Sequence, residues 1–260
     1  MESLFILVAS FKMLKAMKKL IYSLLLTLTT VSLAISGPAI TRKTLELPEF
    51  TGIYVNSGYT VYLKQSNKQE VAVEVLSEIF EISEFKVDKG ILHINVARKP
   101  KNSNESIWSK IEDVKIAPTM NVYISMKDIS ALQVNGSGSI ISENSIAATH
   151  LDLALSGSGD MELDVKGREL TTLVSGSGTL ALKGYANTNE ILVSGAGKLN
   201  AFDCEVNDAF VTLSGSGLCE IHVTEELEAT VQGSGTVKHK GNTKSVLKKE
   251  YGKGAVERAY

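Results

Sequence analysis

Serine stands between two glycines at five places in the second half of the chain, where a hydroxyl on a tight turn could act as a nucleophile. The triplets begin at Gly136, Gly157, Gly176, Gly195, Gly215 and Gly233, and the fourth of them reads Gly-Ala-Gly. A nucleophilic serine needs a histidine base and a carboxylate that orients the base. Because the repeat places no such pair beside any one serine, we interpret these serines as corner residues that hydrogen-bond local backbone or the next repeat. No catalytic residue is assigned.

Metal-ligating residue types are present but scattered. The four histidines, His93, His150, His222 and His239, lack the paired spacing that zinc sites use. Calcium-binding β-rolls have a nine-residue period with an aspartate in each copy, whereas only Asp160 follows a triplet here. We therefore expect no metal ligand and no cofactor.

Four outward charged residues offer a more specific enzymatic hypothesis. Some extracellular β-helices cleave acidic polysaccharides with carboxylates, a metal or basic residues gathered on one face, and Glu162, Lys198, Glu220 and Lys238 occupy outward positions. Opposite charges on stacked strands usually form solvated cross-strand pairs instead. A polysaccharide-active enzyme is therefore the alternative, and a non-enzymatic protein is favoured.

A repeat positions all of these residues. Successive triplets start 18 to 21 residues apart, and a fixed period near 20 residues predicts a solenoid in which each repeat buries its apolar face on the next. Apolar residues alternate with polar ones on both sides of each triplet, as in half-buried strands. The inward columns are Val134, Leu155, Val174, Val193, Leu213 and Val231 before the corner, and Ile140, Met161, Leu180, Leu199, Cys219 and Val237 after it.

The glycines are expected to form the corners of the coils. A sharp bend often needs a positive φ, and stacked strands lie only about 4.8 Å apart, so a column without Cβ relieves crowding. The fold class is therefore all-β, a parallel β-helix with coils of about 19–20 residues and three short strands per coil. The predicted structural corner glycines are Gly136, Gly138, Gly157, Gly159, Gly176, Gly178, Gly195, Gly197, Gly215, Gly217, Gly233 and Gly235.

The first 36 residues resemble an export signal with an extension before it. Residues 17–36 combine two lysines, an apolar run over 20–35 and a small-residue motif ending at Ser36, as in a signal peptide cleaved after Ser36. We expect Met17 to be the biological start and residues 1–16 to be an upstream extension. An uncleaved double anchor is the alternative, although the apolar run is shorter than the roughly 18 residues of a membrane span.

One domain is expected to follow, over residues 37–260. Irregular coils are predicted for 41–130, with a polar loop at 99–106 and a single helical turn within 79–85, and regular coils for 131–240. Residues 241–260 are predicted to form a polar C-terminal cap. Gly252 there repeats the corner, while Lys248 and Glu250 replace the aliphatic residues of the inward columns.

Charge and cysteine content limit the partners. Removing residues 1–36 takes away four of the 27 basic and one of the 29 acidic residues, which leaves a net charge of −5 without a basic cluster. This balance argues against nucleic acid as a partner. The only cysteines, Cys204 and Cys219, fall in different columns of the repeat, so we favour two separate buried thiols over a disulfide.

The chain resembles the head GIN domain family of auto-transporter adhesins. The resemblance lies in residues 50–63 (Phe-Thr-Gly-Ile-Tyr-Val-Asn-Ser-Gly-Tyr-Thr-Val-Tyr-Leu), in 89–94 (Lys-Gly-Ile-Leu-His-Ile) and in the serial Ser-Gly-Ser-Gly repeats. It implies a right-handed parallel β-helix in the envelope of a Gram-negative bacterium, with adhesion as its role, and it brings no catalytic residues. The chain departs from the family where aspartate often follows the triplet, since this column reads Ser139, Asp160, Thr179, Lys198, Leu218 and Thr236.

The sequence thus favours an exported, non-enzymatic surface module that binds a glycan or a protein. Its expected location is the periplasm, the outer surface or the medium, and it would touch the membrane only through the transient signal peptide. Homo-oligomerisation stays open. Besides the polysaccharide-active enzyme, a structural component of the envelope remains an alternative.

Overall fold

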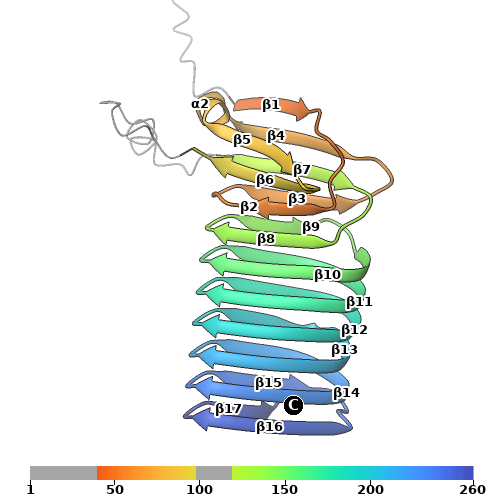
Figure 1. Ribbon diagram of the computed structural model, residues 1–260, viewed down its shortest axis with the longest axis vertical. Coiled ribbons are helices and arrows are strands. Elements are labelled where there is room, and N and C mark those ends of the chain that lie inside the picture. Colours follow the sequence, from red (N-terminus) through yellow and green to blue (C-terminus); the bar gives the residue numbers. More distant parts are fainter. Residues whose placement is uncertain (1–39, 98–118, 260) are drawn as a thin grey trace, which may run out of the picture. The chain divides into compact units, whose positions relative to one another are not determined.

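A computed structural model describes residues 40–97 and 119–259 of the chain, and nearly all of this part is β-structure (Figure 1). The expected signal peptide, the polar loop at 99–106 and Trp108 lie outside the described residues. In the described part, no helix is long and apolar enough to cross a membrane.

The second half of the chain is a parallel stack in which each coil pairs with the next at a shift of one repeat (Figure 1). Gly157 is paired with Gly176, Gly176 with Gly195 and Gly195 with Gly215. This parallel pairing confirms the fold class predicted from the repeat. The chain forms a β-solenoid of about 7 turns. The strands are β8 (Ala131–Gly136), β9 (Ser139–Ser142), β10 (Ile146–Gly157), β11 (Asp160–Gly176), β12 (Thr179–Gly195), β13 (Lys198–Gly215), β14 (Leu218–Gly233), β15 (Thr236–Lys240), β16 (Ser245–Gly252) and β17 (Ala255–Arg258).

A single long strand forms each regular coil, rather than the three short strands expected. β11 alternates buried and exposed residues along its length, and the alternation breaks only where Arg168 and Glu169 are both exposed. The chain turns at that point while it keeps its ladder of hydrogen bonds to the coils on either side. Each coil therefore has two broad sides, joined at one end by a glycine corner and at the other by this smoother bend.

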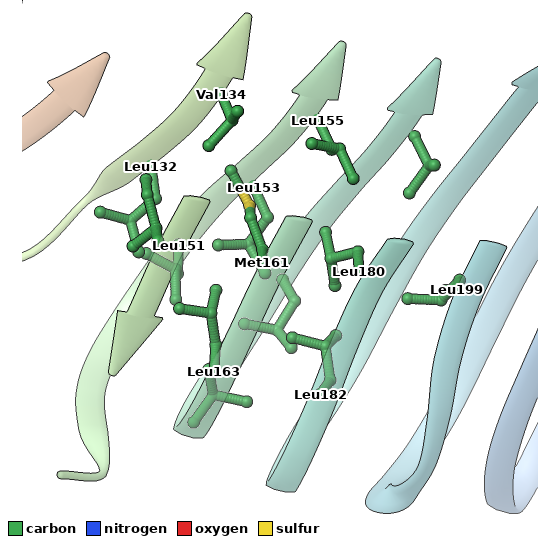
Figure 2. Packing of buried hydrophobic residues seen from close by; sticks show 14 of the residues in the cluster. Leu132, Val134, Leu151, Leu153, Leu155, Met161, Leu163, Leu180, Leu182 and Leu199 are labelled. Carbon is green, nitrogen blue, oxygen red and sulfur yellow. The ribbon is translucent and has the colours of Figure 1, made fainter. Parts of the chain in front are cut away.

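The core is the space between the two sides, and the predicted columns fill it. Leucine and valine side chains from successive coils stack in rows, as with Leu132 and Leu153 and with Val134 and Leu155 in Figure 2. Every residue of the two predicted inward columns is buried. Two polar residues inside, Thr172 and Asn189, hydrogen-bond each other over 2.9 Å, which offsets the cost of burying them.

The first half of the chain contributes two coils out of sequence order and a set of antiparallel strands. β2 (Gly52–Val55) and β3 (Thr60–Gln65) form one coil, which is inserted between β8/β9 and the coil of β6 (Ile91–Val96) and β7 (Met120–Met126). Beyond β6 and β7, the strands β1 (Ile40–Leu45), β4 (Glu70–Leu76) and β5 (Ser83–Asp88) run antiparallel. The helical turn expected within 79–85 overlaps α2 (Ser77–Glu81), which begins two residues earlier, and residues 83–85 belong to β5 instead.

Two charged side chains occupy inward columns in the coil of β16 and β17. Lys248 aligns with Ala229 and Glu250 with Val231. The ammonium group of Lys248 donates to the carbonyl oxygen of Val256 over 2.7 Å, and the carboxylate of Glu250 accepts the Val256 N–H over 2.7 Å. Inward-pointing charges are a common means of blocking further strand pairing. This coil therefore differs from the preceding one in having charged residues where that coil has apolar ones.

Candidate functional site

The glycine corners are exposed at their middle residue and buried at their second glycine. The first glycine of every triplet has φ between +91° and +143°. A Cβ on Gly157 would lie 2.6 Å from the carbonyl oxygen of Gly136, and one on Gly217 would lie 2.5 Å from that of Gly197. Neighbouring corners are linked through backbone, as where the Ser158 N–H donates to Gly136 over 2.9 Å.

The histidines and outward charges singled out from the sequence do not gather into one centre. In the described ranges 40–97 and 119–259, no group of three or more histidine, cysteine, aspartate or glutamate residues could hold a metal ion. His150 pairs with Asp152 over 3.1 Å and with Glu169 over 3.6 Å on an exposed edge. His239 is buried, and burial, followed by the nearby charges of Lys248 and Arg258, lowers its pKa.

Three of the four charged residues considered for polysaccharide cleavage, Glu162, Glu220 and Lys238, share one row of the sheet, and Lys198 lies in another. Lys238 pairs with Glu220 across neighbouring strands at 3.9 Å, the solvated arrangement that the charge pattern suggested. Ala181 and Asn200 stand between Glu162 and Glu220 in that row, whereas Lys198 aligns with Thr179. The fold therefore does not bring Glu162 and Lys198 together.

Both cysteines are buried free thiols. Burial, together with the charge of Asp164, raises the pKa of Cys204 to about 12, and burial beside Glu220 raises the pKa of Cys219 further still. A thiol is nucleophilic only as the thiolate, so neither residue is a candidate for chemistry.

A hollow with aromatic and charged walls lies on the first coils, and the sequence analysis did not identify it. We call it the tyrosine hollow. Tyr62 on β3 and Tyr123 on β7 stack with their ring centroids 5.2 Å apart and their planes 14° apart. The guanidinium carbon of Arg42, on β1, lies 5.5 Å from the centroid of Tyr123. The hollow has a volume of about 160 Å³, and its lining includes these three side chains together with Lys64, Glu70, Ala72, Ser125 and Glu143.

The order of the strands explains why this hollow exists. β1, β4, β7 and β3 lie side by side in that order (Figure 1), and Ala72 on β4 is paired with Tyr123 on β7. Because alanine is short, Arg42 can reach across β4 to the ring of Tyr123. In the neighbouring row Ser125 lies between Lys64 and Glu70, so small residues form the floor and long ones the walls.

The floor is held in place by hydrogen bonds. The Ser125 hydroxyl donates to the Lys68 carbonyl oxygen over 2.9 Å and lies 2.6 Å from the Ser66 hydroxyl. The charges of the walls are partly paired, since Arg42 lies 3.9 Å from Glu74 and Lys68 lies 3.1 Å from Glu70. Preformed hollows with aromatic lining and a few convergent polar groups are the usual form of ligand sites.

A larger cavity, of about 600 Å³, lies between the end of β1 and the start of β4. The amide in its lining, Gln69, donates to the carbonyl oxygens of Leu47 and Pro48 and accepts the N–H of Phe50. These bonds hold residues 45–50 against the coils and leave the amide little capacity for a ligand. The smaller tyrosine hollow is therefore the stronger candidate site.

One signal in the sequence could have pointed to the tyrosines. Each is the outward residue of an alternating strand, with Tyr62 between Val61 and Leu63 and Tyr123 between Val122 and Ile124. Their pairing depends on the insertion of one coil between two others, which no local pattern reveals.

The fold and the site together define a β-solenoid with a ligand-sized hollow near one end of its coils. The chain belongs to the family described as putative auto-transporter adhesin, head GIN domain, whose model matches residues 49–243. A search of the curated proteins finds no match.

Solved structures share this fold at low sequence identity. A putative adhesin from Bacteroides fragilis has a TM-score of 0.73 and 19% identity over 86% of this chain and 98% of its own. A protein from Parabacteroides distasonis described as putative lipid binding has a TM-score of 0.67 and 21% identity over 85% and 97%. A putative adhesin from Parabacteroides merdae has a TM-score of 0.63 and 20% identity over 85% and 96%. At these identities the likeness is one of fold.

Proposed function

We propose that this protein is an exported, non-enzymatic binding module of the cell envelope that holds a glycan or protein partner on the outward side of its coils. The family description and the solved adhesins of the same fold support this assignment. The observation that carries it is the tyrosine hollow, in which stacked aromatic rings and convergent polar groups lie on an otherwise regular solenoid.

The proposal includes the organisation expected from the sequence. Residues 1–36 would direct export and be removed, and residues 37–260 would form one domain whose corner glycines serve the coil geometry alone. The location would be the periplasm, the outer surface or the medium. Fractionating cells that express an epitope-tagged chain, with N-terminal sequencing of the product, tests both parts. Retention of an intact leader in the cytoplasm would contradict them.

The binding role is tested on the purified protein, produced by export so that the leader is processed. It is screened against immobilised glycans and against envelope proteins, and every polymer that it captures is then analysed for chain length. We expect saturable capture with the polymer left intact.

One observation favours a second function, a polysaccharide-active enzyme. Glu70 and Glu143 both line the tyrosine hollow, and paired carboxylates beside a sugar site are the usual machinery of glycosidic bond cleavage. The chain-length analysis separates the two functions, since shortening of the captured polymer would establish the enzyme. If turnover is found, Glu70→Gln and Glu143→Gln identify which carboxylate the reaction needs.

A further inference from the structure

We propose that the tyrosine hollow binds a single ring of a neutral glycan, with the apolar face of the sugar laid against Tyr62. This inference rests on the proposed binding function and names the class of ligand and the residues that recognise it. It is argued from the size, the aromatic surface and the charge of the hollow.

The size of the hollow suits one sugar ring. Sites that enclose a whole drug-sized molecule measure about 300–1,000 Å³, whereas this hollow measures about 160 Å³. Protein partners of a stable complex bury about 800 Å² on each side, far more than a hollow of this size offers. A glycan can place one residue in the hollow while the rest of its chain continues along the broad side of the coils.

The aromatic surface is oriented for sugar stacking. The rings of Tyr62 and Tyr123 stack on each other and both line the hollow. The face of Tyr62 away from Tyr123 is on the β9 side, where the shorter neighbour Ile141 is outside the lining and Glu143 is part of it. Aromatic faces carry partial negative charge, and the axial C–H groups of a pyranose carry partial positive charge. Arg42 lies over Tyr123, which leaves Tyr62 as the ring for the ligand.

Charged side chains around the hollow supply hydrogen-bond partners for sugar hydroxyls. Lys64 donates, and the carboxylates of Glu70 and Glu143 accept. All three side chains are exposed at the mouth of the hollow. A hydroxyl both donates and accepts, so neighbouring hydroxyls of a sugar can use both kinds of group.

The balance of charge selects a neutral ligand. The walls carry two basic residues, Arg42 and Lys64, and two acidic ones, Glu70 and Glu143. Arg42 also lies near Glu74. Because these charges balance, an acidic sugar would meet two carboxylates as well as two cations, gain little net attraction and lose its hydration. A neutral sugar meets no such penalty.

The test measures binding of the exported, purified protein to an array of neutral glucans, mannans and galactans beside uronate and sialylated glycans. The strongest neutral glycan is then titrated against Tyr62→Ala, Tyr62→Phe and a control, Tyr185→Ala. Tyr185 is a matched control because it is 52% exposed on β12, away from the hollow. We expect about a tenfold weaker affinity for Tyr62→Ala and little change for the other two.

A charge variant adds a second readout. Glu143→Gln should weaken binding of the neutral glycan several-fold, because an amide accepts a hydroxyl less strongly than a carboxylate does. Tighter binding after this change, or a preference of the wild type for acidic glycans, would overturn the neutral-ligand assignment. Thermal melting of each variant shows whether the fold is intact.

The remaining outcomes separate this inference from the proposed function. Capture of a neutral glycan that is equally strong in Tyr62→Ala of unchanged melting temperature would overturn the site and leave the binding function standing. Saturable capture of an envelope protein without any neutral glycan would do the same. Shortening of the polymer would instead overturn the non-enzymatic function itself.

Discussion

At the scale of single residues, the two kinds of position in a Gly-Ser-Gly corner carry different constraints. Gly157 has φ +116°, and a Cβ there would lie 2.6 Å from the Gly136 carbonyl oxygen. Its neighbour Ser158 is exposed, and the equivalent position two coils later is Ala196. The glycine is therefore fixed by backbone geometry, and the serine is replaceable.

We expect Gly157→Ala to lower the free energy of unfolding by about 2 kcal/mol or more, since it adds both strain at positive φ and a backbone clash. Ser158→Ala should change it by less than about 0.5 kcal/mol. Urea denaturation followed by circular dichroism measures both. Equal stabilities for Gly157→Ala and the wild type would show that the corner can relax.

His239 makes the stability of the coils depend on pH. It occupies the inward column after Ile221, is 4% exposed, and its Nδ1 has no hydrogen-bond partner in the described part of the chain. Burial, followed by the charges of Lys248 and Arg258, lowers its pKa in the folded state. The unfolded chain then binds the proton more readily than the folded one.

The stability contributed by neutral His239 is therefore complete above the unfolded pKa of about 6.5 and is lost as the pH falls below it towards the folded pKa. We expect His239→Ile, which copies the preceding coil, to lose less stability than the wild type between pH 7 and pH 5. Identical pH profiles for His239→Ile and wild type would contradict the assignment.

At the scale of elements, the coil of β16 and β17 carries two charges at inward positions that are apolar in the coil before it. All eight residues of β16 are exposed, while Val256 on β17 is buried, accepts a hydrogen bond from Lys248 at its carbonyl oxygen and donates one from its N–H to Glu250. The pair satisfies backbone groups of β17 from inside the coil.

Glu250→Ala leaves the Val256 N–H without this acceptor, so we expect faster amide hydrogen exchange over residues 255–258. Exchange in β11 and β12 should stay unchanged, because long-range stacking holds those coils. Glu257→Ala is the matched control, since Glu257 is exposed on the same strand. Equal exchange of Val256 in Glu250→Ala and wild type would show that the carboxylate is dispensable.

At the scale of the whole chain, the sequence predicted the stack and its core but neither the order of the strands in the first half nor the site. The inward column that contains Val134 and Leu155 could be assigned as buried, because parallel, in-register stacking places equivalent residues of successive coils in the same environment. The insertion of β2 and β3 between later strands depends on long-range pairing, which leaves no periodic trace. The tyrosine hollow arises from that insertion, with Tyr62 and Tyr123 lying 61 positions apart in the chain.

The most direct test of glycan binding without cleavage measures the affinity for one glycan and the chain length of the same glycan after it is recovered. The exported protein is titrated with the neutral glycan that it binds best, and the chain length of that glycan is determined after prolonged incubation. We expect saturable binding that Tyr62→Ala weakens about tenfold and a polymer of unchanged length. Binding that is indifferent to Tyr62, together with a shortened polymer, would contradict both the site and the non-enzymatic function.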